Sequence, residues 1–228
     1  MIRNYFSKGN MSIRDKIYSL DYFLILLVLL LGIISIFAMY STDGGEILYH
    51  TKNHTYRFIT FFVMMMIISF FNIKLWHATG YIFYIFVLAL LFWASYYGVT
   101  ASGSQRWINL YFINLQPSEL MKIAIIVCFS KYYHRMQVSN VNKLKNILIP
   151  LVILFIPIAL VVSQPDLGTA ILIALSGLIV LWLAGVNAKY FFYSGLLFII
   201  SAPFVISFLQ PYQKSRILSF FDPDRDPL

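Results

Sequence analysis

The chain has few charged residues, and this scarcity is its first informative property. Only 11% of its 228 residues are Asp, Glu, Lys or Arg, whereas 60% are hydrophobic and the mean hydropathy is +0.78. A soluble domain of this size has no use for so much apolar surface, and long apolar runs are what crossing a bilayer requires. The composition therefore predicts an integral membrane protein.

Cysteine and histidine are also scarce, which limits the chemistry of the chain. Cys128 is the single cysteine and lies inside an apolar run, so no intramolecular disulfide can form. The four histidines are scattered and form no ligand cluster with cysteine, and neither a phosphate-binding loop nor a nucleophile elbow is present. No cofactor is predicted. A divalent cation bound by the aspartates of the last stretch is an alternative that the sequence leaves open.

Seven apolar segments are each about one membrane span long. Because the backbone must satisfy its own hydrogen bonds in lipid, runs of this length are expected to be helices. The sequence predicts an all-α polytopic transmembrane helical bundle in one domain, residues 1–228, with a tail over 1–20 and a truncated outer loop over 210–228. The predicted spans are 22–40, 57–73, 81–97, 117–133, 146–163, 168–186 and 190–209.

The basic residues predict an orientation. With the N-terminus in the cytoplasm, the inside segments hold ten Lys and Arg residues and the outside segments hold six. Cytoplasmic flanks are richer in Lys and Arg, so the N-terminus is predicted to be cytoplasmic. The net charge of +8 has the same explanation, and no nucleic-acid partner is expected.

Two charges lie inside the fourth apolar segment, in the stretch "LQPSELMKIAIIVCF". Glu119 and Lys122 are three residues apart, so they share a helix face and can form an ion pair. Glu119 also suits the first turn after Pro117, where a carboxylate favours the helix dipole, so simple capping is an alternative. Ionisable groups in membranes usually face a bundle interior or a wet cavity. The pair is therefore predicted to shape a polar cavity that opens to the outer face.

Two further stretches extend this candidate site. "SQPDLGTA" repeats a Gln-Pro followed by an acid, and Asp166 is either a helix cap or a member of the same outward-facing site. In "GSQRWINL", Arg106 beside Trp107 suits the membrane interface, as a simple anchor or as a partner for an anionic lipid head group.

The last stretch, "YQKSRILSFFDPDRDPL", carries Lys214 and Arg216 followed by three alternating aspartates. Carboxylates at alternate positions suggest a calcium or magnesium site. The glycine and closing glutamate of a calcium-binding loop are missing, and Asp-Pro favours turns, so turn and cap residues are the competing interpretation.

Together these stretches resemble the shape, elongation, division and sporulation family of membrane proteins. The resemblance rests on "GSQRWINL", "LQPSELMKIA", "QPDLGTAIL" and "SRILSFFDPDRDPL", which stand in the family's order and cover essentially the whole chain. "QPDLGT" and "DPDRDPL" are closer to the RodA branch than to the FtsW branch.

The resemblance implies a ten-span fold, of which this chain holds about seven spans, in the bacterial cytoplasmic membrane. It also implies a peptidoglycan glycosyltransferase that polymerises lipid II, releases undecaprenyl pyrophosphate and works with a class B penicillin-binding protein. The family's functional positions map onto Arg106, Glu119, Lys122, Asp166 and Arg216.

The family's presumed general-base aspartate lies beyond Leu228, so the resemblance supplies no catalytic residue here. The chain by itself is therefore expected not to polymerise lipid II. Two alternatives stay open. One is a lipid II flippase or transporter, since charges inside a bundle suit transport as well. The other is a non-catalytic membrane scaffold that binds a penicillin-binding protein.

Overall fold

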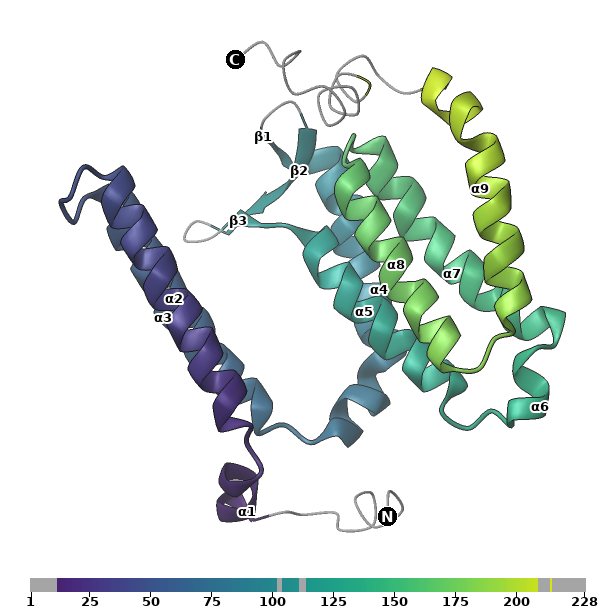
Figure 1. Ribbon diagram of the computed structural model, residues 1–228, viewed down its shortest axis with the longest axis horizontal. Coiled ribbons are helices and arrows are strands. Elements are labelled where there is room, and N and C mark those ends of the chain that lie inside the picture. Colours follow the sequence, from purple (N-terminus) through teal and green to yellow (C-terminus); the bar gives the residue numbers. More distant parts are fainter. Residues whose placement is uncertain (1–11, 102–103, 111–113, 209–213, 215–228) are drawn as a thin grey trace. The chain divides into compact units, whose positions relative to one another are not determined.

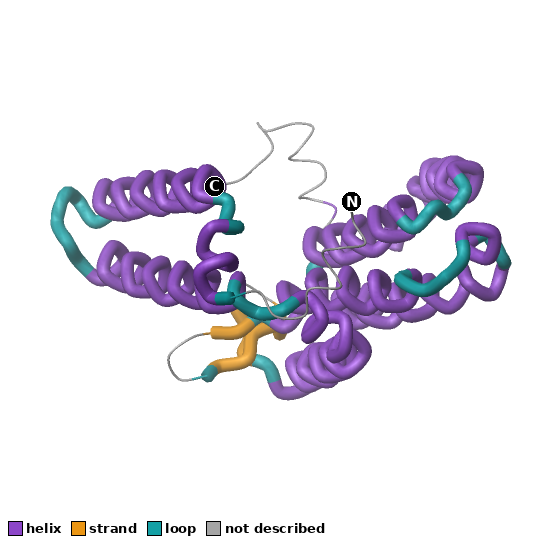
Figure 2. Tube along the Cα trace, turned by 90° about the horizontal axis from the view of Figure 1, so that it is seen from below, coloured by secondary structure: helices purple, strands orange, loops and turns teal. Residues whose placement is uncertain are grey.

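The computed structural model describes residues 12–101, 104–110, 114–208 and 214. The chain divides into two compact units, one up to Leu75 and the other from Trp76 onward. Helices dominate both units, and the strands are confined to a short part of the second (Figure 2).

The first unit is a helical hairpin preceded by a short helix. Its elements are α1 (Ile13–Tyr18), α2 (Tyr22–Thr42) and α3 (Tyr49–Ser69). α2 begins where the Asp21 carboxylate accepts the Leu24 N–H, which supplies one missing helical partner. α2 and α3 pack together, and Gly32 lets the Phe58 ring approach the α2 backbone. Small residues allow helices to pack this closely in membranes.

The second unit is a bundle with a small antiparallel sheet at one end and α6 at the other (Figure 1). The sheet order is β1-β2-β3, and β3 leads directly into α5. α5 packs against α8, and α8 packs against α7. The elements are α4 (Ile73–Tyr97), β1 (Val99–Ala101), β2 (Ser104–Asn109), β3 (Asn114–Leu115), α5 (Pro117–Tyr133), α6 (Val138–Val141), α7 (Leu144–Ser163), α8 (Leu167–Leu183) and α9 (Ala188–Phe208).

Each of the central helices buries one stripe and leaves its other faces apolar and exposed. The buried positions recur every three or four residues, which is the spacing of one helix face. On α4 they are Gly80, Tyr84, Val87, Leu91 and Ala94, and on α7 they are Ile147, Pro150, Leu154, Pro157 and Val161. Large hydrophobic side chains remain exposed around the bundle, which is what a lipid environment requires.

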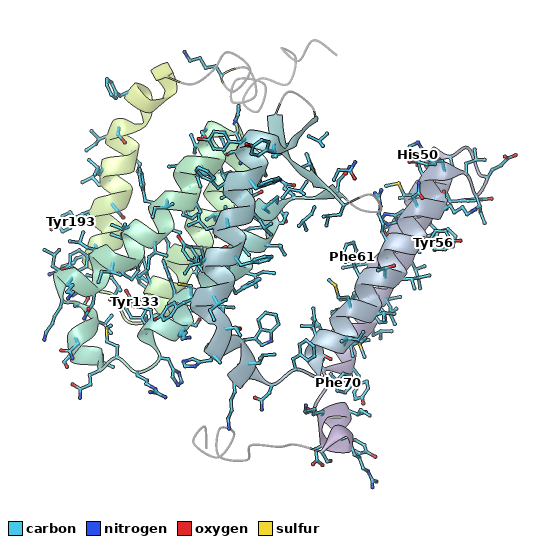
Figure 3. All side chains as sticks on the ribbon, turned by 180° about the vertical axis from the view of Figure 1, so that it is seen from behind. His50, Tyr56, Phe61, Phe70, Tyr133 and Tyr193 are labelled. Carbon is cyan, nitrogen blue, oxygen red and sulfur yellow. The ribbon has the colours of Figure 1, made fainter. Side chains whose placement is uncertain are left out.

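α7 contains two interior prolines, and both backbone defects are repaired by tyrosines. A proline has no N–H, so the carbonyl four residues earlier loses its helical partner. For Pro157 that carbonyl belongs to Ile153, and the Tyr84 hydroxyl on α4 donates to it at 2.8 Å. For Pro150 it belongs to Asn146, and the Tyr133 hydroxyl donates to it at 2.7 Å. Figure 3 shows Tyr133 among the helices of the bundle.

The predicted fold class is confirmed: the protein is an all-α, multi-span helical membrane protein. Among the described residues, three helices are long and apolar enough to cross a membrane by length and composition: Tyr22–Thr42, Ile73–Tyr97 and Leu144–Ser163. The helix bounds differ from the predicted segments most at α3 and α4, which begin eight residues earlier than the apolar runs. The eight added residues of each helix include polar side chains such as Lys52 and Lys74, which lower the hydropathy without preventing helical hydrogen bonds.

The tyrosine–proline pairs predict a specific energetic coupling. Tyr84→Phe leaves the Ile153 carbonyl buried without a donor and should destabilise the protein by about 1 kcal/mol. In a Pro157→Ala background the alanine N–H can bond that carbonyl, so the same Tyr84→Phe change should then cost much less. A double-mutant cycle on the free energy of unfolding in detergent measures the difference.

Tyr193→Phe is the matched control, because Tyr193 is 64% exposed on α9 and points away from the bundle (Figure 3). It should leave the free energy of unfolding unchanged. Equal costs of Tyr84→Phe with and without Pro157 would show that the hydroxyl does not compensate for the proline.

Candidate functional site

Arg106 is positioned by the small sheet that precedes α5. The strand β2 pairs antiparallel with β1, where Val99 opposes Trp107, and with β3, where Ile108 opposes Leu115. The sequence analysis placed this stretch between the predicted spans 81–97 and 117–133 and predicted no strand in it. The sheet holds Arg106 close to the start of α5, and its side chain is only 24% exposed.

Asp166 contacts Arg106, Gln116 and Thr169, and these four residues are called the junction below. Asp166 caps α8, accepting the Thr169 N–H at 3.2 Å and the Thr169 hydroxyl at 2.8 Å. Its Oδ2 also lies 2.9 Å from Arg106 Nη1 and accepts the Gln116 side-chain amide at 3.2 Å. One buried carboxylate therefore links β2, the residue that precedes α5 and the first turn of α8.

The electrostatics of this junction favour the ionised carboxylate. Burial alone raises the pKa of Asp166, but the hydrogen bonds from Thr169 and the nearby Arg106 guanidinium outweigh it, so the pKa lies below its usual value. Asp166 is 8% exposed, and a buried charge of this kind is stable only when it is paired and hydrogen-bonded. The carboxylate is thus well suited to position its neighbours and poorly suited to accept a proton.

Glu119 and Lys122 form the predicted ion pair on α5. Lys122 Nζ donates to both Glu119 oxygens, at 2.8 and 2.9 Å. The Glu119 side chain is 55% exposed and that of Lys122 is 23% exposed. The pair begins one helical turn beyond Gln116, so it lies on the helix whose start contacts Asp166. Among the residues that the structure describes, no ion pair joins Glu119 or Lys122 to the Arg106–Asp166 pair.

Two donors beside the junction remain without acceptors. Arg106 Nε and Ser118 Oγ are buried and have no hydrogen-bond partner within the described ranges. Ser118 follows Pro117 in the first turn of α5 and is 1% exposed. Arg106 therefore uses Nη1 to hold Asp166, while its Nε has no acceptor among the described residues.

The remaining sequence-based candidates fall in the last stretch of the chain. Arg216 and the alternating aspartates lie outside the described residues, so the predicted cation site falls there too. Within the described part of the chain, no group of three His, Cys, Asp or Glu side chains could hold a metal ion.

Sequence reasoning missed the two glutamines, although the repeated Gln-Pro was the signal that could have found them. Gln116 donates to Asp166, and Gln164 donates to the Leu91 carbonyl at 3.2 Å and to the Ser95 hydroxyl at 2.8 Å. The repeat drew attention to the acids that follow it, whereas both glutamines tie a helix end to another segment. Thr169 was missed because a threonine one turn after a capping acid is common.

These features define a class: a multi-span helical membrane protein with a buried Arg106–Asp166 ion pair at one end of its bundle. The chain belongs to the FtsW/RodA/SpoVE family of cell cycle proteins, whose sequence model matches residues 17–228. The resemblance stated from the motifs is confirmed.

Individual relatives carry glycosyltransferase names. The chain is 33% identical over 215 residues to the peptidoglycan glycosyltransferase MrdB of Escherichia coli K12, covering 94% of this chain and 57% of the relative. It is 32% identical over 192 residues to a probable peptidoglycan glycosyltransferase FtsW of Buchnera aphidicola subsp. Schizaphis graminum, covering 82% and 54%. The chain thus spans about half the length of the curated relatives that it matches.

Solved structures share the fold. One is a chain of a peptidoglycan synthase complex that coordinates polymerization and crosslinking, with a TM-score of 0.79 and 21% identity over 92% of this chain and 61% of that chain. Another is the rod shape determining protein RodA of Thermus thermophilus, with a TM-score of 0.69 and 18% identity over 80% of this chain and 59% of that chain.

The junction predicts a large loss of stability on Asp166→Asn. Asparagine still caps α8, but the partly buried Arg106 guanidinium loses its counter-charge, which should cost about 3 kcal/mol. The free energy of unfolding in detergent measures this loss. Asp21→Asn, at the exposed cap of α2, is the control and should stay within about 0.5 kcal/mol of the wild type. Equal effects of the two substitutions would contradict the role of Asp166 as a junction.

Asp166 also predicts a fall in stability at acid pH. Because its pKa is lower in the folded protein than the ordinary value of 3.8, its contribution is complete above that value and is lost as the pH falls through the folded pKa. The free energy of unfolding should decline more steeply below about pH 4 in the wild type than in Asp166→Asn. Parallel curves would show that the carboxylate does not titrate in this range.

Proposed function

We propose that the chain belongs to a peptidoglycan glycosyltransferase that polymerises lipid II in the cytoplasmic membrane during cell elongation. The observation that carries the proposal is the contact between Arg106 Nη1 and Asp166 Oδ2, made beside Gln116 and the first turn of α5. This contact fixes a guanidinium whose Nε has no acceptor among the described residues, and the adjoining helix α5 carries a second cation, Lys122.

The chemistry follows from the charge on the substrate. Lipid II carries a pyrophosphate between its sugar and its polyisoprenoid tail, and bonds from cationic groups to phosphate oxygens are among the strongest hydrogen bonds. Arg106 and Lys122 are assigned to the pyrophosphate, with Arg216 as a third candidate cation. When the bond from the sugar carbon to the pyrophosphate breaks, negative charge grows on the departing oxygens, and fixed cations stabilise that charge.

The two acids are assigned positioning roles. Asp166 accepts four hydrogen bonds and keeps its charge, so it orients Arg106 rather than removing a proton. Glu119 holds the Lys122 ammonium at 2.8 Å. Together with Arg106, Lys122 and Arg216, these acids form the proposed substrate-binding set.

Orientation and partners are part of the same proposal. The N-terminus is assigned to the cytoplasm, because Lys131, Arg135, Lys143, Lys145 and Lys189 lie in or near the connections opposite the sheet. A class B penicillin-binding protein is the proposed partner. The support is the fold shared with a chain of a synthase complex that coordinates polymerization and crosslinking.

The decisive experiment uses the protein as its gene encodes it, reconstituted with its penicillin-binding partner in liposomes that contain fluorescent lipid II. Wild-type protein should yield glycan chains on a gel. Arg106→Ala and Lys122→Gln should each lower the rate about a hundredfold, because each removes a fixed charge from the leaving pyrophosphate.

Lys145→Gln is the matched control, since it removes a lysine from the start of α7 and should leave the rate unchanged. Movement of lipid II between leaflets without any polymer would instead identify a flippase. Binding of the partner with neither activity would identify a scaffold.

A further inference from the structure

A groove lies between α2 and α3 in the first unit, whereas the described residues assigned above belong to the second unit. Its volume is about 760 Å³, within the range of about 300–1,000 Å³ that is usual for ligand pockets. Its apolar lining includes Ile36 and Phe37 on α2 and Ile47 in the connection. Its polar lining includes Tyr40, Lys52 and Tyr56, and Figure 3 shows Tyr56 projecting from the part of α3 nearest to His50.

Lys52 is an unusual charge for this place. α2 carries no charged side chain, and α3 carries only Lys52 and Arg57 besides two histidines. Lys52 lies in the first turn of α3, at the positive end of the helix dipole, where a cation is unfavourable and an anion is favoured. Leu48, which precedes the helix, supplies no side-chain cap. The anion at this end of the helix is the Asp43 carboxylate, which accepts the Thr51 N–H, and Lys52 follows it as a cation.

The acid at the start of α3 is already engaged with backbone and hydroxyl donors. Asp43 Oδ2 accepts the Thr51 N–H and the Thr51 hydroxyl, both at 2.7 Å. No ion pair of Lys52 occurs among the described residues. The hydroxyls of Tyr40 and Tyr56 likewise have no hydrogen bond within that part of the chain. The groove thus presents three donors next to an apolar surface.

We propose that this groove binds an anionic phospholipid of the surrounding membrane, with its phosphodiester at Lys52 and one acyl chain along Ile36 and Phe37. The occupant follows from charge complementarity: an ammonium and phenolic hydroxyls suit a phosphate, and the adjoining apolar wall suits a hydrocarbon chain. A lipid is also the ligand that a groove between membrane helices meets at the highest concentration. The inference is independent of the proposed glycosyltransferase function.

The test uses a phosphatidylglycerol probe with a diazirine on its acyl chain, in nanodiscs of phosphatidylcholine that contain the wild-type protein. After irradiation, peptide mass spectrometry should place the label on residues of α2 and α3 that line the groove. Unlabelled phosphatidylglycerol should compete with the probe, whereas added phosphatidylcholine should not.

Lys52→Gln should weaken binding of the probe about fivefold, which corresponds to one lysine acting on an anionic lipid. Arg57→Gln is the matched control, because it removes the same charge from the same helix at a residue that does not line the groove. It should leave labelling of the groove unchanged. Thr55→Phe, which places a ring inside the groove, should reduce labelling without removing any charge.

Several results would overturn the proposal. Equal losses in Lys52→Gln and Arg57→Gln would show a general charge effect with no site. Equal competition by phosphatidylcholine would show that the groove is an apolar surface that does not select the lipid head group. Label confined to the second unit, or a polyisoprenyl phosphate that displaces the probe far more strongly than phosphatidylglycerol, would show that the proposed phospholipid is not the occupant.

Discussion

The carbonyls of Ile153 and Asn146 set the arrangement of the second unit. Pro157 and Pro150 remove their helical donors, and inside a bilayer no water replaces them. The donors come from Tyr84 on α4 and Tyr133 on α5. α7 is therefore bonded near its start to α5 and at its middle to α4, so that α4, α5 and α7 act as one support for the site.

That support matters because the site is assembled from the ends of elements. Arg106 comes from β2, Gln116 precedes α5 and Asp166 precedes α8, and none of them would be held by its own segment alone. Gln164 adds a bond from the end of α7 to the Leu91 carbonyl of α4. The charged junction thus depends on the apolar packing below it, where α5 and α8 bury residues such as Phe129 and Ile173.

In both units a charged side chain needs a partner, and the two units differ in where that partner comes from. In the second, the buried carboxylate of Asp166 is satisfied by four protein donors, and this makes a rigid junction. In the first, Lys52 has no such internal partner among the described residues, and an external anion is the natural complement. Satisfied charges position a site, whereas unsatisfied charges beside an apolar groove are available to a ligand.

The sequence by itself determined the fold class, the family and the pairing of Glu119 with Lys122. Long apolar runs allow only helices in lipid, and residues three apart on a helix are neighbours wherever that helix lies. Hydropathy could not place the starts of α3 and α4, because polar side chains such as Lys52 and Lys74 interrupt the apolar pattern in residues that are still helical. It also gave no sign of the strands β1 to β3, which are short and mixed in composition.

Only the tertiary structure decided which groups meet across the chain. Arg106 and Asp166 are 60 residues apart by number, and their contact depends on how β2 and α8 pack. The sequence marked both as candidates and suggested that Asp166 would join Glu119 and Lys122. In the structure Asp166 bonds Arg106, Gln116 and Thr169. Local spacing fixes contacts within one helix, but contacts between helix ends arise from packing, which no single segment encodes.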